Sequence, residues 1–190
     1  MSCLKTKDLG LRRNERWLFK NLNLNIPAGS VVAILGPSGV GKSSLISCLS
    51  GSESPTEGEI NFECKAGEIR NPENISPELG IIFQSLRLTE HVTVLEDVLY
   101  GKIAQYGLKE SFFGFPESDK NIAYETLKEL GIAHLAYKWT SQTSGGEKQR
   151  TAIARTLFQD PKFILADEPV SNLDNYYSGR VTGLFRNLAS

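Results

Sequence analysis

The sequence predicts an α/β fold, and three observations carry this prediction. The apolar, β-branched run Val31–Leu35 (VVAIL) suits a strand that is buried on both faces. A glycine-rich turn at 36–43 (GPSGVGKS) follows it directly and leads into a helix. A second apolar run, Phe163–Ala166 (FILA), ends at two carboxylates. Apolar strands followed by polar turns and helices are typical of sheets whose carboxyl edge carries a binding site.

The length of the chain predicts one domain, or one domain with a small inserted lobe, and its charge limits the partners that we expect. The chain has 190 residues, with 21 basic and 22 acidic side chains. Because these charges nearly balance, we expect no nucleic-acid partner and no electrostatic membrane anchor. The N-terminus lacks an apolar signal-peptide region, and the longest clearly apolar runs are strand-sized. We therefore expect a chain that does not itself span a membrane.

The cysteines predict neither a disulfide framework nor a metal site. Cys3, Cys48 and Cys64 are odd in number, scattered along the chain and without metal-ligand spacing. Such usage fits a reducing compartment, in which isolated thiols serve as small buried apolar groups. We expect all three to be structural.

The segment 36–43 satisfies the phosphate-loop pattern G-x-x-x-x-G-K-[ST] between a strand and a helix. Glycines let backbone N–H groups approach phosphate oxygens, and the helix adds the positive end of its dipole. Lys42 would reach the β- and γ-phosphates of ATP, and the Ser43 hydroxyl would bind Mg²⁺. The alternative, a glycine turn that binds nothing, fits the complete pattern poorly. The expected phosphate-site residues are Gly36, Pro37, Ser38, Gly39, Val40, Gly41, Lys42, Ser43 and Ser44.

Partner residues for this loop follow two other apolar strands. Asp167 emerges at the carboxyl end of Phe163–Ala166, where ligands bind in open α/β sheets, and would hold Mg²⁺ through water. The neighbouring Glu168 is the candidate general base for the attacking water. Gln84 follows the run 79–83 (LGIIF), and its amide oxygen could contact Mg²⁺ or that water. The alternative for the two acids is a pair of solvated loop carboxylates.

A second glycine-rich turn, 143–150 (TSGGEKQR), precedes a helical stripe in 147–158. A serine hydroxyl, glycine N–H groups and a helix dipole make this another potential anion site. Since the chain has only one phosphate loop, the turn would serve a nucleotide held elsewhere, as in a head-to-tail pair of chains. The alternative is an ordinary capped helix. The residues expected to contact that nucleotide are Ser144, Gly145, Gly146 and Glu147.

These motifs together resemble the nucleotide-binding domain of ABC transporters over essentially the whole chain. They are, in order, GPSGVGKS, Gln84, TSGGEKQR, FILADEP and SNLD at 171–174. The resemblance implies a P-loop NTPase core, an antiparallel β lobe from the N-terminal residues and 58–70, and a helical subdomain at about 86–142. It also implies a homodimer with two ATP molecules sandwiched between the phosphate loop of one copy and the signature turn of the other. Segment 171–174 would be the D-loop that crosses the dimer interface.

The function implied by the resemblance is ATP hydrolysis that powers membrane transport. The partners would be transmembrane permease subunits, which Gln84 would sense, and through them a solute-binding protein. The chain would be cytoplasmic and peripheral on the inner face of the membrane. The insertion 108–120 (LKESFFGFPESDK) resembles ATP-binding subunits of phosphonate importers, although aromatic residues in such a loop are more often packed than functional.

Three alternatives stay open on the sequence. The chain could be a catalytically weak ATP-dependent dimerisation module. It could be the ABC ATPase of a lipoprotein-release or other non-import system. A P-loop kinase is a third possibility, but a kinase has no use for a signature turn acting in a second copy.

The sequence departs from the family pattern at the base and in the signature. Family members stack an aromatic residue on adenine ahead of the phosphate loop; here Arg13 falls near that position and Trp17 lies close by. Either side chain could stack on the base. Thr143 and Glu147 replace the usual leucine and glutamine of the signature, and an acid should be tolerated at a helix N-terminus.

A further departure concerns the C-terminus. Family members have another strand after the helix that follows the D-loop, and it ends in a histidine that contacts the γ-phosphate. This chain ends at Ser190, and neither His91 nor His134 occupies the matching place. The sequence therefore predicts a truncated product, in which ATP binding survives better than turnover.

Overall fold

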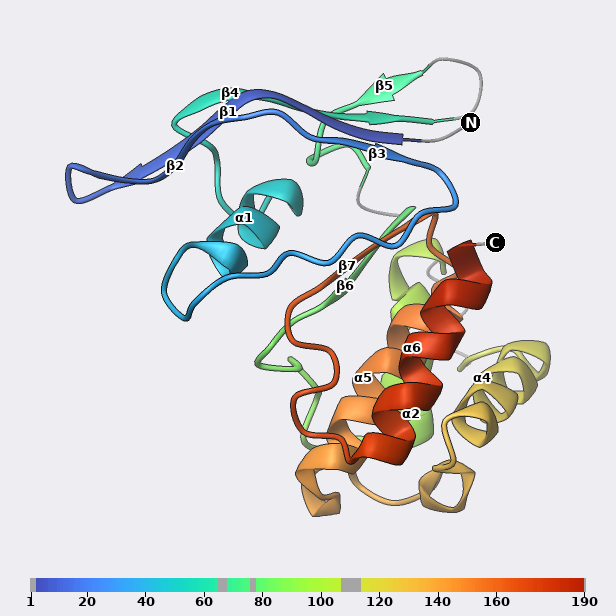
Figure 1. Cartoon of the computed structure of the whole chain (residues 1–190). Coiled ribbons are helices and arrows are strands. Elements are labelled where there is room, and N and C mark those ends of the chain that lie inside the picture. The colour runs from blue at the N-terminus through green and yellow to red at the C-terminus, as the bar shows by residue number, and fades with distance from the viewer. Residues whose placement is uncertain (1–2, 65–67, 76–77, 107–113, 190) are drawn as a thin grey trace. The chain divides into compact units, whose positions relative to one another are not determined.

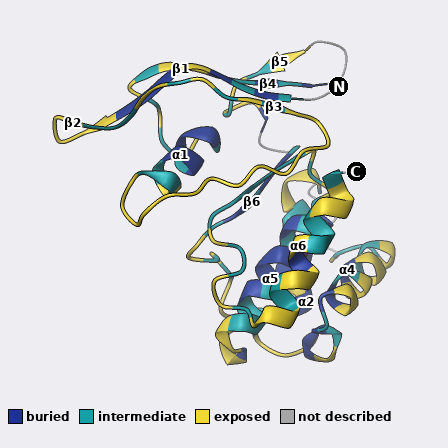
Figure 2. Ribbon diagram, in the orientation of Figure 1, coloured by how far each residue is buried: buried dark blue, intermediate teal, exposed yellow. Residues whose placement is uncertain are grey.

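The computed structural model describes residues 3–64, 68–75, 78–106 and 114–189. The chain divides into two compact units (Figure 1). The first consists of Met1–Leu79 and Leu184–Ser190, and the second of Gly80–Gly183. Each unit has its own buried core, seen as the dark blue segments in Figure 2.

The first unit is built on an antiparallel sheet with strand order β2-β1-β4-β5, in which β3 also pairs with β1. This confirms the antiparallel β lobe predicted from the N-terminal residues and 58–70. A hairpin joins β1 to β2 through Asn14 and Glu15, which both have positive φ (45° and 63°), as two-residue hairpin turns require. The strands are β1 (Cys3–Arg13), β2 (Arg16–Leu22), β3 (Asn25–Pro27), β4 (Glu57–Glu63) and β5 (Ile69–Arg70).

Helix α1 (Lys42–Leu49) follows the phosphate loop, as predicted, and buries Leu45, Ile46 and Leu49. The cysteine prediction is confirmed for Cys48 and Cys64, which are buried and form no disulfide. Burial raises the pKa of the Cys48 thiol to about 11, so it stays protonated at neutral pH.

The predicted strand Val31–Leu35 is wrong. The segment has no strand assignment and its side chains are exposed, with Val31 at 57% and Leu35 at 89%. A strand has no hydrogen bonds of its own and forms only against a partner. In the described part of the first unit, the strands pair with one another and none pairs with this segment. The β-branched composition of this segment alone is therefore not sufficient to form a strand.

The second unit is mainly helical, with a two-stranded sheet of β6 and β7. Helix α5 packs against α2 and α4, and its predicted apolar stripe buries Ile153 and Ala154 completely. The helix predicted at 147–158 is confirmed as α5, and the described residues of the predicted helical segment 86–142 contain α2, α4 and three 3₁₀ helices. Leu79 and the end of α6 from Leu184 belong to the first unit. The remaining elements of the chain are β6 (Leu79–Ile82), α2 (Val94–Leu99), η3 (Tyr100–Gln105), α4 (Glu117–Glu129), η4 (Ala133–Leu135), η5 (Thr140–Gln142), α5 (Gly145–Phe158), β7 (Phe163–Ala166) and α6 (Asn175–Ala189).

The aromatic insertion 108–120 is described only from residue 114. Phe115 packs between Tyr100 and Tyr106, with ring centroids 5.9 and 5.4 Å away. Its packed environment agrees with the prediction that such aromatics are structural. Phe112 and Phe113 lie outside the described residues. Among the residues that the structure does describe, none of the helices is long and apolar enough to cross a bilayer.

Candidate functional site

The phosphate loop lies in the first unit as an exposed turn that ends at α1. Gly39 and Gly41 have φ values of 79° and 108°, which other residues adopt only with strain. A Cβ at Gly39 would meet nothing within 4 Å, so its backbone conformation, and not lack of space, requires glycine. Gly41 is the N-cap of α1, so the helix N-terminus directly follows the turn.

The Lys42 side chain folds back over this loop. Its ammonium donates to the carbonyl oxygens of Gly36 (2.9 Å) and Pro37 (3.0 Å). An ammonium has three N–H donors, so one remains for an anion beside the loop. The positive charge is thus held at the turn that the sequence assigns to phosphate.

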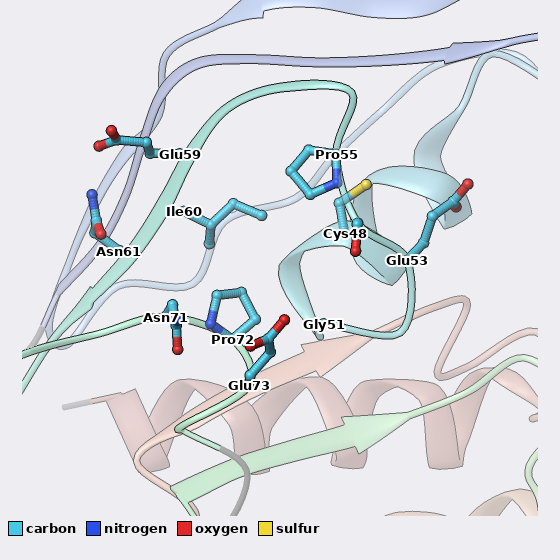
Figure 3. Close-up of a pocket in the computed structure, with 11 residues that line it drawn as sticks. Cys48, Gly51, Glu53, Pro55, Glu59, Ile60, Asn61, Asn71, Pro72 and Glu73 are labelled. Atoms are coloured by element: carbon cyan, nitrogen blue, oxygen red, sulfur yellow. The ribbon is translucent and has the colours of Figure 1, made fainter.

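A separate pocket of about 250 Å³ lies at the other end of α1, against β4 (Figure 3). Cys48, Ile60 and Pro72 form part of its wall. Its lining residues include Glu53, Glu59 and Glu73 but no lysine or arginine, which makes it a poor site for a triphosphate. It shares no lining residue with the phosphate site at 36–44.

In the second unit, the carboxyl ends of β6 and β7 lie side by side, because the Asp167 N–H donates to the Ile82 carbonyl at 2.9 Å. This brings together Gln84 and Glu168, which are 84 positions apart in the chain. The Gln84 Nε2 group donates to Glu168 Oε2 at 3.4 Å, and both side chains are exposed. Glu168 has φ of 52°, in the left-handed region that favours glycine.

Ser144 is the N-cap of α5, and it forms a capping box with Glu147. The Ser144 hydroxyl accepts from the Glu147 N–H at 3.4 Å, while Glu147 Oε2 accepts from the Ser144 N–H at 2.7 Å. That backbone hydrogen bond lowers the pKa of the Glu147 carboxyl. The Ser144 hydroxyl also interacts with the Glu147 carboxylate and lowers its pKa further.

The D-loop segment Ser171–Asp174 lies against the signature turn. A Cβ at Gly146 would come within 3.1 Å of the Asn172 carbonyl oxygen, whereas a Cβ at Gly145 would meet nothing within 4 Å. The close approach explains a glycine at 146 by packing, and the open space at 145 leaves room for a ligand. Asp174 accepts from the Tyr177 N–H at 2.9 Å at the start of α6.

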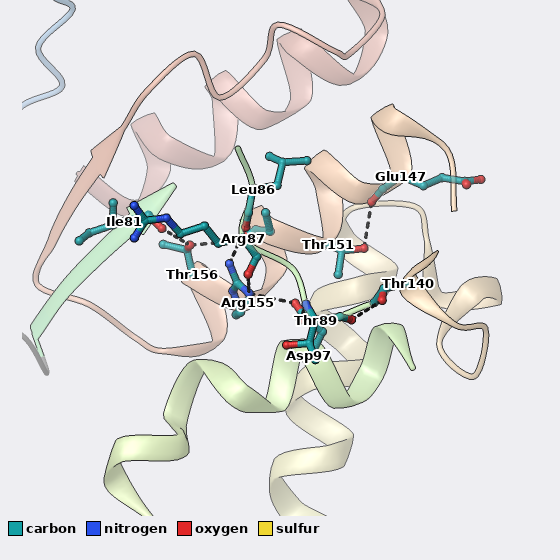
Figure 4. Close-up of polar contacts among 11 residues, drawn as sticks. Ile81, Leu86, Arg87, Thr89, Asp97, Thr140, Glu147, Thr151, Arg155 and Thr156 are labelled. Atoms are coloured by element: carbon teal, nitrogen blue, oxygen red, sulfur yellow. Dashed lines mark hydrogen bonds and ion pairs between the residues drawn. The ribbon is translucent and has the colours of Figure 1, made fainter. Parts of the chain in front are cut away.

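Arg155 of α5 fixes the segment that follows Gln84 (Figure 4). Its guanidinium donates to the carbonyls of Leu86 (2.8 Å) and Arg87 (2.9 Å), both of which have positive φ. It also contacts the carboxylate of Asp97 at 3.2 Å. Asp97 is fully buried and accepts from the Thr89 N–H at 2.9 Å. Burial raises the pKa of Asp97, against the effects of Thr89 and Arg155.

We expect Asp97→Ala to destabilise the second unit by about 3 kcal/mol, because it leaves Arg155 without its buried carboxylate. Asp97→Asn is the matched control, since its amide oxygen can still accept from the Thr89 N–H. It should cost distinctly less. Urea unfolding followed by helical circular dichroism measures both, and an Asp97→Ala variant as stable as the wild-type chain would contradict the role given to the ion pair.

Arg13 and Trp17, the two residues considered for adenine stacking, differ in the contacts that their side chains already make. The Arg13 guanidinium makes three hydrogen bonds of 2.6 to 3.0 Å to the Glu53 carboxylate. Trp17 has the Lys20 ammonium 4.7 Å from its ring centroid and Arg12 at 5.9 Å. Arg13 must break an ion pair before it can stack on a base, whereas Trp17 already presents its ring to cationic groups.

Residues 19–171 match the family model described as ABC transporter. This chain belongs to the ABC transporter family. As an ABC-type ATPase subunit, it resembles the "Phosphonates import ATP-binding protein PhnC 2" of Oceanobacillus iheyensis, with 39% identity over 92% of this chain and 70% of the relative. The corresponding protein of Lactobacillus gasseri is 40% identical over 85% of this chain and 64% of its own length. The chain thus spans about two thirds of the curated relatives it matches.

Solved ABC cassettes have the same fold. The dimeric structure of MJ0796, a bacterial ABC transporter cassette, has a TM-score of 0.82 and 30% identity over 98% of this chain and 82% of that one. A post-hydrolysis dimeric form of the same cassette, bound to ADP and Pi, gives the same TM-score and identity and covers 83% of that chain. The predicted α/β P-loop NTPase fold of ABC type is therefore confirmed, and the family binds and hydrolyses ATP.

Sequence reasoning missed three polar residues of this ABC subunit: the buried Gln149 and Asp97, and the half-buried Arg155. Gln149 and Arg155 lie on α5, on the sides of the helix that meet the turn after β7 and the segment after β6. Polar residues within a helix ordinarily face solvent, so their spacing gave no signal. Only the long-range contacts reveal what they do.

Proposed function

We propose that this chain is the ATP-binding and ATP-hydrolysing subunit of an ABC importer, active as a homodimer. The observation that carries the proposal is the N-terminus of α5. Ser144 and Gly145 are exposed there, a Cβ at Gly145 would meet nothing within 4 Å, and the D-loop packs beside the turn at Gly146. A chain with one phosphate loop gains a use for this second anion site when it faces the ATP of another copy.

The proposed chemistry is attack of water on the γ-phosphorus of ATP, with release of ADP and phosphate. Lys42 and the amides of 36–43 stabilise the charge on the phosphate oxygens, together with Ser144 of the opposing copy. Glu168 accepts the proton of the attacking water as its oxygen bonds to phosphorus. Gln84, which contacts Glu168 at 3.4 Å, helps to orient that carboxylate and the water.

Mg²⁺ fits the donor set that we assign to it. Ser43, Asp167 and Gln84 offer a hydroxyl, a carboxylate and an amide oxygen, which are the hard ligands that this ion prefers. When bound, the ion would neutralise charge on the β- and γ-phosphates. Ser43 lies in the first unit, and Gln84 and Asp167 lie in the second. The support for this set of ligands is therefore the chemistry of its donor atoms.

We further propose that the transported solute is a phosphonate or phosphate ester. The support is the name shared by the relatives from Oceanobacillus iheyensis and Lactobacillus gasseri, which are called phosphonates import ATP-binding proteins. The partners would then be transmembrane permease subunits and, through them, a solute-binding protein. The chain would lie on the cytoplasmic face of the membrane, bound to the permease.

Complementation tests the transport assignment. A bacterial strain that lacks the ATP-binding subunit of its phosphonate importer is supplied with this chain, with Lys42→Ala, or with the subunit of a relative. We expect growth on a phosphonate as the sole phosphorus source with the wild-type chain but not with Lys42→Ala. Growth with the relative's subunit, but none with this chain at equal expression, would argue against phosphonate import.

We expect Ser144→Arg to block dimer closure while sparing ATP binding. The arginine adds a long side chain at an exposed N-cap and removes the serine hydroxyl, but the residue lies outside the phosphate loop. Ser144→Ala is the comparison variant, because it removes the same hydroxyl and the cap, which costs about 1 kcal/mol, without adding a long side chain. Fluorescent-nucleotide titration and light scattering in ATP measure the two properties. Equal loss of ATP binding and dimerisation would mean that the turn is only structural.

A further inference from the structure

One buried side chain of α5 links the signature turn to both the Glu168 turn and the D-loop. Gln149 lies in the second helical turn after Ser144, and only 1% of it is exposed. A buried amide must find partners for its donors and its acceptor, or its burial is costly. Those partners show what the residue holds in place.

Both ends of the Gln149 amide are hydrogen-bonded. Its Nε2 group donates to the Pro169 carbonyl at 2.8 Å and, at the limit of hydrogen bonding, to the Glu168 carbonyl at 3.5 Å. Its Oε1 atom accepts from Asn172 Nδ2 at 3.2 Å. The side chain thus bridges the backbone beside the proposed general base and the D-loop.

The Glu168 backbone depends on such support. Its φ of 52° lies in a region that non-glycine residues occupy only when their surroundings hold them there. From the D-loop side, the Glu168 carbonyl also accepts from the Ser171 hydroxyl (3.0 Å) and the Ser171 N–H (3.2 Å). Gln149 supplies the contacts from the side of α5. A change at Gln149 therefore alters the direction of the Glu168 side chain more readily than it alters the helix.

We propose that Gln149 is a positioning residue for hydrolysis. It fixes the backbone that carries the Glu168 carboxylate relative to α5 and to the D-loop. The inference rests on the proposed role of Glu168 as general base. Gln149 is buried, and its amide is hydrogen-bonded to Pro169, Glu168 and Asn172, so we give it no direct contact with nucleotide or water. It acts through the carbonyls of Glu168 and Pro169, so its loss should lower kcat and leave ATP affinity nearly unchanged.

Gln149→Leu tests the proposal, because leucine has a similar volume but no hydrogen-bonding groups. We expect kcat of the ATPase to fall by about tenfold to a hundredfold, with KM for ATP changed less than about twofold. Thr151→Val is the matched control. Thr151 is equally buried on α5, but its hydroxyl donates to the Glu147 carbonyl within the helix, so this variant should keep wild-type kcat.

Gln149→Glu adds a readout that a purely structural role would not move. Ionised, the carboxylate would repel the Glu168 and Pro169 carbonyls; protonated, its O–H can donate to Pro169 as the amide does. We expect the ratio of its kcat to that of wild type to rise as pH falls from 8 to 6, while the ratio for Gln149→Leu stays low. ATP binding by both variants at 25 °C controls for folding.

Two results would overturn the inference. One is wild-type kcat in a folded Gln149→Leu variant. The other is a ratio for Gln149→Glu that does not change with pH. If the wild-type chain itself binds ATP without turning it over, the proposed function fails first and the inference fails with it. That outcome is distinct, since it appears before any variant is compared.

Discussion

Replacing Lys42 with alanine is expected to weaken ATP binding by at least about a hundredfold, because it removes charge-assisted hydrogen bonds to the phosphates. The side chain is already held over the phosphate loop by the carbonyls of Gly36 and Pro37, so its charge needs little reorganisation to meet ATP. Titration with a fluorescent ATP analogue measures the effect.

The control for Lys42→Ala is Lys7→Ala, which removes an exposed lysine of β1 in the same unit. Its ATP affinity should equal that of wild type. Comparable melting temperatures for both variants would show that lost binding does not reflect unfolding. Unchanged affinity in folded Lys42→Ala would be incompatible with a phosphate site at 36–43.

Glu168→Gln should reduce hydrolysis by about a hundredfold to ten-thousandfold and trap an ATP-bound dimer. An amide cannot take up the proton that a general base must accept, yet it fills nearly the same space. The exposed position of Glu168 and its contact with Gln84 leave the carboxylate accessible to a water molecule. Phosphate release gives the rate, and light scattering in the presence of ATP gives the mass.

Glu129→Gln controls for the change of charge, because Glu129 is an exposed residue near the end of α4. It should hydrolyse ATP at the wild-type rate and show no trapped dimer. A Glu168→Gln chain that stays monomeric in ATP would count against the general base and the shared site together. Normal hydrolysis by it would exclude Glu168 as the base.

Local sequence signals predicted most of the elements that position the site. Glycine at 41 and serine at 144 begin helices as expected, because caps depend on a few neighbouring residues. The apolar runs before Gln84 and Asp167 form β6 and β7. The strand at Val31–Leu35 was wrong, because a strand depends on a partner that its own residues do not encode.

The contacts that fix the site could not be predicted in the same way. Gln149 meets Pro169 from 20 positions away, and Arg155 meets Leu86 from 69 positions away. Neither spacing follows from helical or strand periodicity. The positive φ of Glu168 is likewise a consequence of tertiary contacts, since glutamate has no intrinsic preference for that region. The sequence thus predicted which side chains carry the chemistry, while the structure showed the contacts that position some of them.

The central claim is that two copies of this chain build each ATP-hydrolysing site. Mg²⁺-ATP turnover by the purified chain, measured over a wide range of its own concentration, tests this claim most directly. If the signature turn of one copy completes the site of the other, turnover per chain should rise with concentration until the dimer saturates. Turnover per chain that stays constant, in a preparation shown to be monomeric at each concentration, would contradict the account.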